Sequence, residues 1–191
     1  MTDLTGIVLA GGYSTRMKTD KAFLQYHGVE QYQYIVNLLD NFCEEIFISC
    51  KTQQNFNGNC IHDLPEYDSI GPAAAWLSVF KATQKGFVMI GIDYPFFDIK
   101  ELQNLIKQRD TAADASVLFH QETGFFEPML GIYEWSFYER LKAQEDAETV
   151  SIQNILRHST VKKVLPLNSQ AITSIDSPEQ YQSALLSLHG K

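Results

Sequence analysis

Short apolar runs alternate with segments of helical periodicity through the first 110 residues of the chain. The runs predict buried strands at residues 7–10, 45–50, 60–63 and 87–92, and the last of these is the most apolar run in the chain. The segments between them predict helices at residues 30–42, 73–83 and 98–109. Strands that alternate with helices in this way indicate βαβ units on a parallel sheet.

The spacing of the elements loosens from about residue 111. Strands are expected at residues 116–119, 124–133 and 161–165, with a last extended piece at 172–176. Helices are expected at residues 134–144, 151–157 and 178–188. The far side of the sheet is therefore expected to be mixed. The predicted fold class is α/β: a three-layer, Rossmann-like, mostly parallel sheet with helices on both faces, in a single domain over residues 1–191.

Two local signals refine this outline. Residues 20–24 give a weaker strand signal, and residues 64–72 are expected to form a loop. Asp98 is a candidate N-cap for the helix that follows it, and Glu101 lies three residues later, as a capping box requires.

The composition, with 45% hydrophobic and 20% charged residues, is that of an ordinary soluble globular protein. A net charge of −8 argues against a broad nucleic-acid or membrane surface. The three cysteines Cys43, Cys50 and Cys60 match no zinc spacing, and reduced thiols are the simple interpretation. Residues 1–5 do not resemble a signal peptide, and no apolar stretch approaches the roughly 20 residues that span a bilayer. A cytoplasmic protein is expected.

Residues 6–24 carry the strongest chemical signal. The first strand breaks at Gly11 and Gly12, and Arg16, Lys18 and Lys21 follow within ten residues of that break. Glycines let backbone N–H groups approach phosphate oxygens closely, and cations neutralise the charge that grows during phosphoryl or nucleotidyl transfer. The string matches neither a Walker A loop nor a G-x-G-x-x-G loop. A glycine turn followed by a solvated basic face is the alternative interpretation.

The complete string is more specific than its glycines. Residues 9–17 read L-A-G-G-x-S-x-R-M, and Asp20 and Lys21 follow. This resembles the nucleotide-binding signature of the GT-A-type nucleotidyltransferases, most closely that of the molybdenum cofactor guanylyltransferase (MobA-type) group, which has glycine where this chain has Lys18. The resemblance implies that Arg16 and Lys21 hold the triphosphate, and Asp20 is expected to orient one of them. The nucleotide-binding residues that it implies are Leu9, Ala10, Gly11, Gly12, Ser14, Arg16, Lys21, Ser49, Asp63 and Gly71.

Two carboxylates are candidate Mg²⁺ ligands. Asp93 ends the most apolar strand, at the edge where open α/β sheets bind ligands. The resemblance implies that Asp93 binds Mg²⁺, whereas a carboxylate that caps a turn is the alternative. Ser174 and Asp176 lie in a segment that resembles the group's closing N-x-N-T-P-E motif. This implies a second metal ligand at Asp176 and an acceptor contact at Ser174, and a helix-start cap before Pro178 is the alternative.

Base and acceptor recognition rest on weaker matches. Asp63, followed by Gly71, resembles the group's guanine-binding region, and a carboxylate suits the N1–H and N2–H₂ donors of guanine. Ser49 replaces the asparagine of the group, and a cap on a loop is the alternative role for Asp63. Glu127, before Pro128, resembles an E-P-L segment on the acceptor side, and its alternative is an edge strand with a proline.

The resemblance implies a nucleotidyltransferase that joins the α-phosphate of GTP to molybdopterin and releases pyrophosphate, with Arg16, Lys21 and Asp93 as catalytic residues. Mg²⁺ is the implied cofactor, and other molybdenum cofactor proteins are candidate transient partners. Two alternatives stay open: a transferase of the same fold that uses CTP or a sugar or alcohol phosphate, and a catalytically silent nucleotide-binding regulator.

Overall fold

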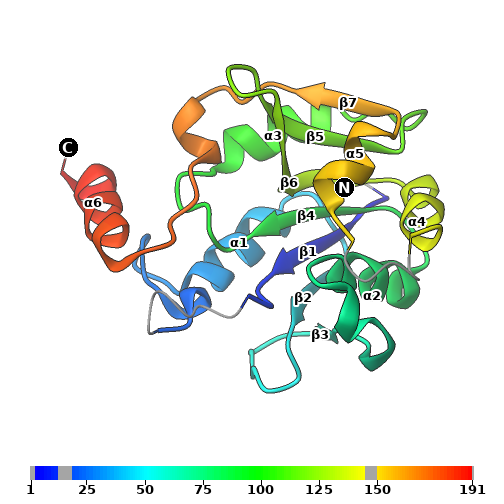
Figure 1. The fold of residues 1–191 in the computed structure, drawn as a ribbon. Coiled ribbons are helices and arrows are strands. Elements are labelled where there is room, and N and C mark those ends of the chain that lie inside the picture. The colour runs from blue at the N-terminus through cyan, green and yellow to red at the C-terminus, as the bar shows by residue number, and fades with distance from the viewer. Residues whose placement is uncertain (1–2, 13–18, 145–149, 191) are drawn as a thin grey trace.

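The computed structural model describes residues 3–12, 19–144 and 150–190, and its strands form one seven-stranded sheet (Figure 1). The strand order is β3-β2-β1-β4-β6-β5-β7. The strands are β1 (Thr5–Leu9), β2 (Ile46–Cys50), β3 (Cys60–His62), β4 (Phe87–Gly91), β5 (Ala115–His120), β6 (Phe125–Tyr133) and β7 (Val161–Val164). Each of these was expected from an apolar run, with its ends displaced by at most two residues.

Strand direction divides the sheet into two halves. β1 runs parallel to β2 and β4, and β2 runs parallel to β3. β6 is antiparallel to both β4 and β5, whereas β5 and β7 are parallel. The parallel first half and the mixed far side are both confirmed. β5 and β6 are antiparallel because only four residues, 121–124, connect them, and a parallel crossover needs a dozen or more.

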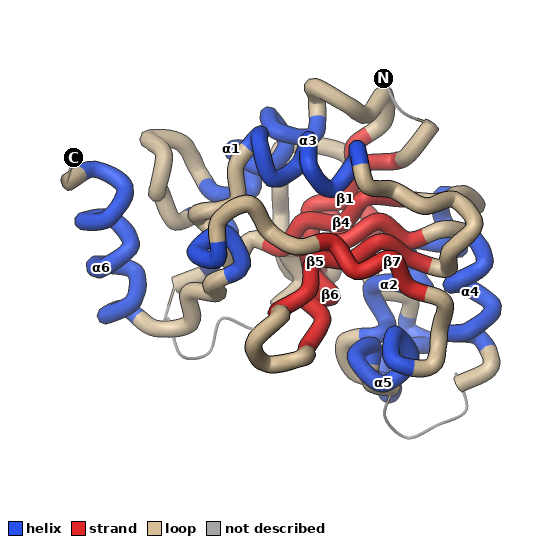
Figure 2. Tube along the Cα trace, turned by 90° about the horizontal axis from the view of Figure 1, so that it is seen from above, coloured by secondary structure: helices blue, strands red, loops and turns tan. Residues whose placement is uncertain are grey.

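Helices cover both faces of the sheet (Figure 2). On one face lie α1 (Gln31–Leu39) and α3 (Ile99–Lys107), and on the other lie α2 (Ala73–Thr83), α4 (Trp135–Lys142) and α5 (Ile152–Arg157). Successive residues of β1 face opposite layers: Ile7 belongs to the core under α2, and Val8 to the core under α1. Strands buried on both faces must be apolar throughout, which explains the continuous runs in the sequence. The three-layer architecture is thus confirmed.

The last helix, α6 (Pro178–His189), lies at one side of the molecule, away from the sheet (Figure 1). It packs through a small separate core that joins Tyr26, Ile175 and Ala184. This packing holds the chain just before α6, where the Ile175 N–H donates to the Asp93 carbonyl at 2.9 Å. Among the described residues, none of the helices has the length and apolar character needed to cross a membrane.

One predicted extended segment is wrong, and a second is helical at its first residue. Residues 20–24 contain a 3₁₀ helix, η1 (Lys21–Phe23), because the Asp20 carboxylate accepts from the Ala22 N–H at 3.0 Å and closes a turn. The predicted extended piece at residues 172–176 starts inside another 3₁₀ helix, η3 (Ser169–Ile172), but the backbone of Thr173 after it is extended. This piece pairs with no strand in the described part of the chain. A third short helix, η2 (Pro65–Ile70), lies in the predicted loop at residues 64–72.

The N-cap of α3 is confirmed, but its capping box is wrong. Asp98 accepts from the N–H groups of Lys100 and Glu101 at 2.9 and 3.0 Å. The Glu101 side chain turns away from the cap and accepts from the N–H groups of Leu167 and Asn168 at 3.1 and 2.8 Å. Because Glu101 is only 2% exposed, its carboxylate satisfies two backbone donors in a largely dry environment. It thereby ties α3 to the segment that leads into η3.

Glu101→Gln is expected to lower the free energy of unfolding by about 1–3 kcal/mol, because the new amide nitrogen faces a backbone N–H and accepts nothing. Urea unfolding measures the change. Glutamine completes a capping box as well as glutamate does. An unchanged stability of the Glu101→Gln variant would therefore mean that the Glu101 side chain bonds to the α3 cap and not to residues 167 and 168. Glu122→Gln, in the exposed turn between β5 and β6, is the control and should change stability by less than about 0.5 kcal/mol.

Candidate active site

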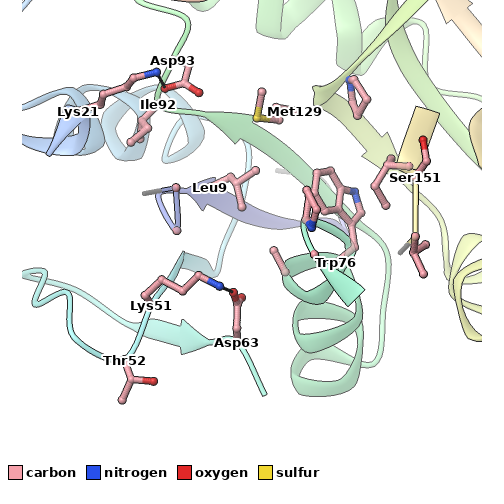
Figure 3. Close-up of a pocket in the computed structure, with 18 of the residues that line it drawn as sticks. Leu9, Lys21, Lys51, Thr52, Asp63, Trp76, Ile92, Asp93, Met129 and Ser151 are labelled. Carbon is pink, nitrogen blue, oxygen red and sulfur yellow. Dashed lines mark hydrogen bonds and ion pairs between the residues drawn. The ribbon is translucent and has the colours of Figure 1, made fainter. Parts of the chain in front are cut away.

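A cleft of about 1160 Å³ opens at the carboxyl ends of β1, β2 and β4. Leu9, Gly11 and Gly12 line it where β1 ends. Figure 3 shows Leu9 between two ion pairs, one formed by Lys21 and Asp93 and the other by Lys51 and Asp63. This arrangement follows from the strand order, because β1 lies between β2 and β4 and brings the loops after all three strands to one edge.

Lys21 joins two carboxylates that lie far apart in the sequence. Its Nζ lies 2.9 Å from Asp93 Oδ1 and 2.6 Å from Asp176 Oδ1. Asp93 follows β4, and Asp176 is held beside it because the neighbouring Ile175 N–H donates to the Asp93 carbonyl. The Ser174 hydroxyl donates to Asp176 Oδ2 at 3.1 Å, so this serine orients a carboxylate. The structure thus brings together one predicted phosphate-binding residue and both predicted metal ligands.

Burial and charge act in opposite directions on the ionisable groups around Lys21. Burial raises the pKa of Asp93, and the charge of Lys21 offsets this only in part. Burial lowers the pKa of Lys21, but its contacts with Asp176 and Asp93 outweigh that effect and leave the pKa raised. No group of three or more histidine, cysteine or acidic side chains suited to a metal ion occurs within the described residues. Two carboxylates are nevertheless enough for a cation that also takes substrate oxygens and water as ligands.

Asp20 orients Lys21 through the backbone. Its Oδ1 caps the 3₁₀ turn that begins at Lys21, and its Oδ2 accepts from Gln54 Nε2 at 2.7 Å. Ser14, Arg16 and Lys18 lie outside the described residues, so their predicted contacts with the triphosphate stay predictions.

The other side of the cleft carries Asp63. Its Oδ2 lies 2.6 Å from Lys51 Nζ, and the Asp63 side chain is only 8% exposed. Its Oδ1 is buried and has no hydrogen-bond partner among the residues that the structure describes. Gly71, which precedes α2 on the same wall, has a φ of +73°, a conformation that favours glycine. A buried acceptor is therefore available at the predicted base side.

Two of the predicted nucleotide-binding residues are buried and do not line the cleft. Ser49 in β2 is fully buried, and its hydroxyl has no hydrogen-bond partner in the described part of the chain. Ala10 is also fully buried, and its carbonyl accepts from Gln54 Nε2 at 3.1 Å. Neither residue lines the cleft, so both can affect the site only through the residues that do line it.

Glu127 does not line the cleft either, although Pro128 and Met129 do. Tyr94 donates its hydroxyl to Glu127 Oε1, and His120 Nε2 lies 2.9 Å from Glu127 Oε2. Burial raises the pKa of Tyr94, which keeps this hydroxyl protonated as a donor. Both carboxylate oxygens of Glu127 are thus engaged with protein groups, and the two residues after it line the cleft instead.

Several residues in or beside the cleft escaped the sequence analysis, among them Lys51, Gln54 and Trp76. Lys51 directly follows a buried strand and lines the cleft, so the positional rule that identified Asp93 applies to it as well. Gln54 lies in a polar loop, where a single glutamine carries no distinguishing pattern. Trp76 lies on the apolar side of the cleft with Met129 (Figure 3), and within an alanine-rich helix it reads as an ordinary core residue.

Comparison with known proteins agrees with this geometry. A "Molybdenum cofactor biosynthesis bifunctional protein" from Synechocystis sp. is 29% identical over 185 residues, which cover 94% of this chain and 53% of that relative. The chain therefore spans about half the length of that protein. A "Probable molybdenum cofactor guanylyltransferase" from Geobacillus sp. is 26% identical over 172 residues, which cover 86% of this chain and 87% of the relative.

Among solved structures, molybdopterin-guanine dinucleotide biosynthesis protein A from Archaeoglobus fulgidus superposes with a TM-score of 0.80. The match covers 98% of this chain and 100% of that one at 19% identity, and it supports the GT-A-type fold. A family model described as "MobA-like NTP transferase domain" matches residues 6–164. The chain therefore belongs to the MobA-like NTP transferase family of nucleotidyltransferases.

Proposed function

We propose that this protein is a GTP:molybdopterin guanylyltransferase that forms molybdopterin guanine dinucleotide and releases pyrophosphate. The observation that carries the proposal is the placement of Lys21 between Asp93 and Asp176, at one end of a cleft whose other side holds Asp63. A cation and two carboxylates suit a metal-bound triphosphate, and a buried acceptor suits its base. The names of the relatives from Geobacillus and Archaeoglobus support the same pair of substrates.

The reaction is a displacement at phosphorus. An acceptor phosphate oxygen attacks the α-phosphorus of GTP, the bond from this phosphorus to the oxygen that bridges to the β-phosphate breaks, and pyrophosphate leaves with the electron pair. No strong general base is required, because the acceptor phosphate is already an anionic nucleophile. The protein contributes position and charge: Lys21 and Arg16 hold the triphosphate while negative charge moves onto the leaving group.

Mg²⁺ is the proposed cofactor, and Asp93 and Asp176 are the residues that would hold it. Magnesium is commonly bound through one or two carboxylates together with substrate phosphates and water, which matches the two side chains present. When bound, the ion supplies charge neutralisation to the triphosphate and a template for in-line displacement. In the proposed complex, Lys21 would exchange part of its contact with the two carboxylates for contact with the phosphate oxygens.

The preference for guanine rests on Asp63 and Lys51. In the proposed complex, the Asp63 carboxylate accepts from the N1–H or N2–H₂ of guanine, and Lys51 stays paired with Oδ2. The remaining wall is largely apolar, and Trp76, Pro128, Met129, Val150 and Ile152 line it. We assign this wall to the acceptor. A cytoplasmic location and transient contact with other molybdenum cofactor proteins accord with the proposal and stay predictions.

A panel of nucleoside triphosphates tests the proposed function. With molybdopterin as acceptor, GTP is expected to support pyrophosphate release at least about tenfold faster than CTP, ATP or UTP, because Asp63 discriminates by hydrogen bonds. Asp63→Asn should reduce this preference, since an amide presents a donor as well as an acceptor. A preference for CTP would point to the alternative transferase, and tight binding without product would point to a silent regulator.

Lys21→Ala is expected to lower kcat/KM for GTP by about 100-fold or more, because a fixed positive charge at the triphosphate is lost. Steady-state pyrophosphate release measures the effect, and thermal unfolding checks that the fold persists. Lys85→Ala is the matched control, because Lys85 also pairs with a carboxylate, that of Glu45, but on an exposed surface. Near-normal turnover of the Lys21 variant would remove this residue from the phosphate site.

Asp93→Asn is expected to abolish turnover at Mg²⁺ concentrations that saturate the wild-type protein, because a neutral amide is a poor ligand for a hard dication. Initial rates over a Mg²⁺ titration measure this. Asp98→Asn makes the same change five residues later and keeps the α3 cap, since asparagine caps helices well. An unchanged Mg²⁺ dependence in the Asp93 variant would place the metal elsewhere.

A further inference from the structure

The side chain of Gln54 connects three segments that border the cleft. Its Oε1 accepts from the Lys51 N–H at 2.9 Å. Its Nε2 donates to the Ala10 carbonyl at 3.1 Å and to Asp20 Oδ2 at 2.7 Å. Both amide hydrogens and the amide oxygen of this side chain are therefore used, across sequence separations of 44 and 34 residues to Ala10 and Asp20.

Each hydrogen-bond partner of Gln54 is next to, or belongs to, a residue of the proposed site. Ala10 directly precedes Gly11 and Gly12, which line the cleft. Asp20 caps the turn that begins at Lys21. Lys51 forms the ion pair with Asp63 on the base side. One amide thus sets the spacing between the phosphate side and the base side of the donor nucleotide.

The chemistry of these contacts requires a primary amide. Asp20 is acceptor-only when ionised, and the Ala10 carbonyl is always an acceptor, so both need an N–H donor. The Lys51 N–H needs an acceptor at the other end of the same side chain. Glutamate has the right length but no donor, and methionine has neither group. Ala10 and Asp20 also bracket, in the sequence, the signature that carries Ser14 and Arg16.

We propose that Gln54 is a positioning residue for the nucleotidyl transfer: it acts through Asp20, Ala10 and Lys51 to align Lys21, the glycine pair and Asp63 on the donor nucleotide. This inference rests on the proposed nucleotide site, but not on the identity of the base or of the acceptor. A residue in this role affects substrate affinity and turnover more than it affects global stability.

Gln54→Glu is the decisive variant, because it keeps the size and the acceptor for Lys51 while it turns an oxygen toward Ala10 and Asp20. With the nucleoside triphosphate that the wild-type protein uses best, kcat/KM is expected to fall about 10- to 100-fold, the effect of losing hydrogen bonds to a charged group. The midpoint of urea unfolding should shift little. Gln108→Glu is the matched control, because it removes a similar amide donor, to Asn104, at the end of α3 and away from the cleft.

A second substitution separates positioning from a general loss of loop structure. In the double variant Gln54→Glu/Asp20→Asn, the donor and the acceptor exchange places. The new amide at position 20 donates to the new carboxylate at position 54, while the amide oxygen still caps the Lys21 turn. The double variant is therefore expected to recover at least about fivefold of the lost kcat/KM, a coupling that independent sites do not show. Titration calorimetry with the same triphosphate and no acceptor should show the tightest binding for the wild-type protein, weaker binding for the double variant and the weakest for Gln54→Glu.

Three results would overturn the inference. Gln54→Glu with wild-type kcat/KM would mean that the two hydrogen bonds from Nε2, to Ala10 and Asp20, do not align the site. A variant that loses stability and activity together, without recovery from Asp20→Asn, would make Gln54 a loop tether only. Wild-type protein that binds no triphosphate would overturn the proposed function as well, whereas the first two results leave that function intact.

Discussion

The contact of Lys21 with Asp93 and Asp176 is the interaction on which the arrangement of the site depends. These residues come from the start, the middle and the end of the chain, and both carboxylates lie within 2.9 Å of a single ammonium group. Burial alone would favour the neutral form of Asp93, and Lys21 opposes that effect. The separate core under α6 has a role in this arrangement, because it holds Ile175 on the Asp93 carbonyl and so keeps Asp176 within reach. A helix that contributes little to the main core is therefore part of the site.

The sheet imposes the second constraint. Because β1, β2 and β4 are parallel and adjacent, their carboxyl ends form one edge, and the polar residues after each strand face a common cleft. The distance between strands then fixes how far the ion pair of Lys21 and Asp93 lies from that of Lys51 and Asp63. Side chains refine this distance, and Gln54 connects the loops after β1 and β2 directly. The backbone thus sets the positions of the loops around the site, and a few side-chain hydrogen bonds fix how these loops lie relative to one another.

The hydrophobic pattern was enough to predict the sheet, its layers and the position of Asp93, because buried strands must be apolar and their ends are marked by polar residues. It could not predict contacts that side chains make across long sequence separations. Glu101 illustrates this: its spacing from Asp98 matches a capping box, but two backbone N–H groups, at Leu167 and Asn168, compete for its carboxylate. Residues 20–24 show the same limit, since their apolar character was compatible with a strand until the Asp20 cap closed a turn.

Lys51 was missed although its position after β2 follows the rule that identified Asp93. Ser14 and Arg16, which lie outside the described residues, rest on the sequence signature alone.

The two ion pairs of the cleft have different consequences for binding. Asp63 is almost completely buried and keeps Lys51 on one oxygen, so a base that donates to the other oxygen adds a contact without breaking the pair. Lys21, in contrast, is engaged by both carboxylates, and a triphosphate competes with them for the same ammonium group. In the proposed complex, a dication on Asp93 and Asp176 would remove this competition, because it would replace the positive charge that the carboxylates lose when Lys21 turns to phosphate. Under the proposed function, binding of metal and of triphosphate would thus be coupled through Lys21, and recognition of the base at Asp63 would be nearly independent of both.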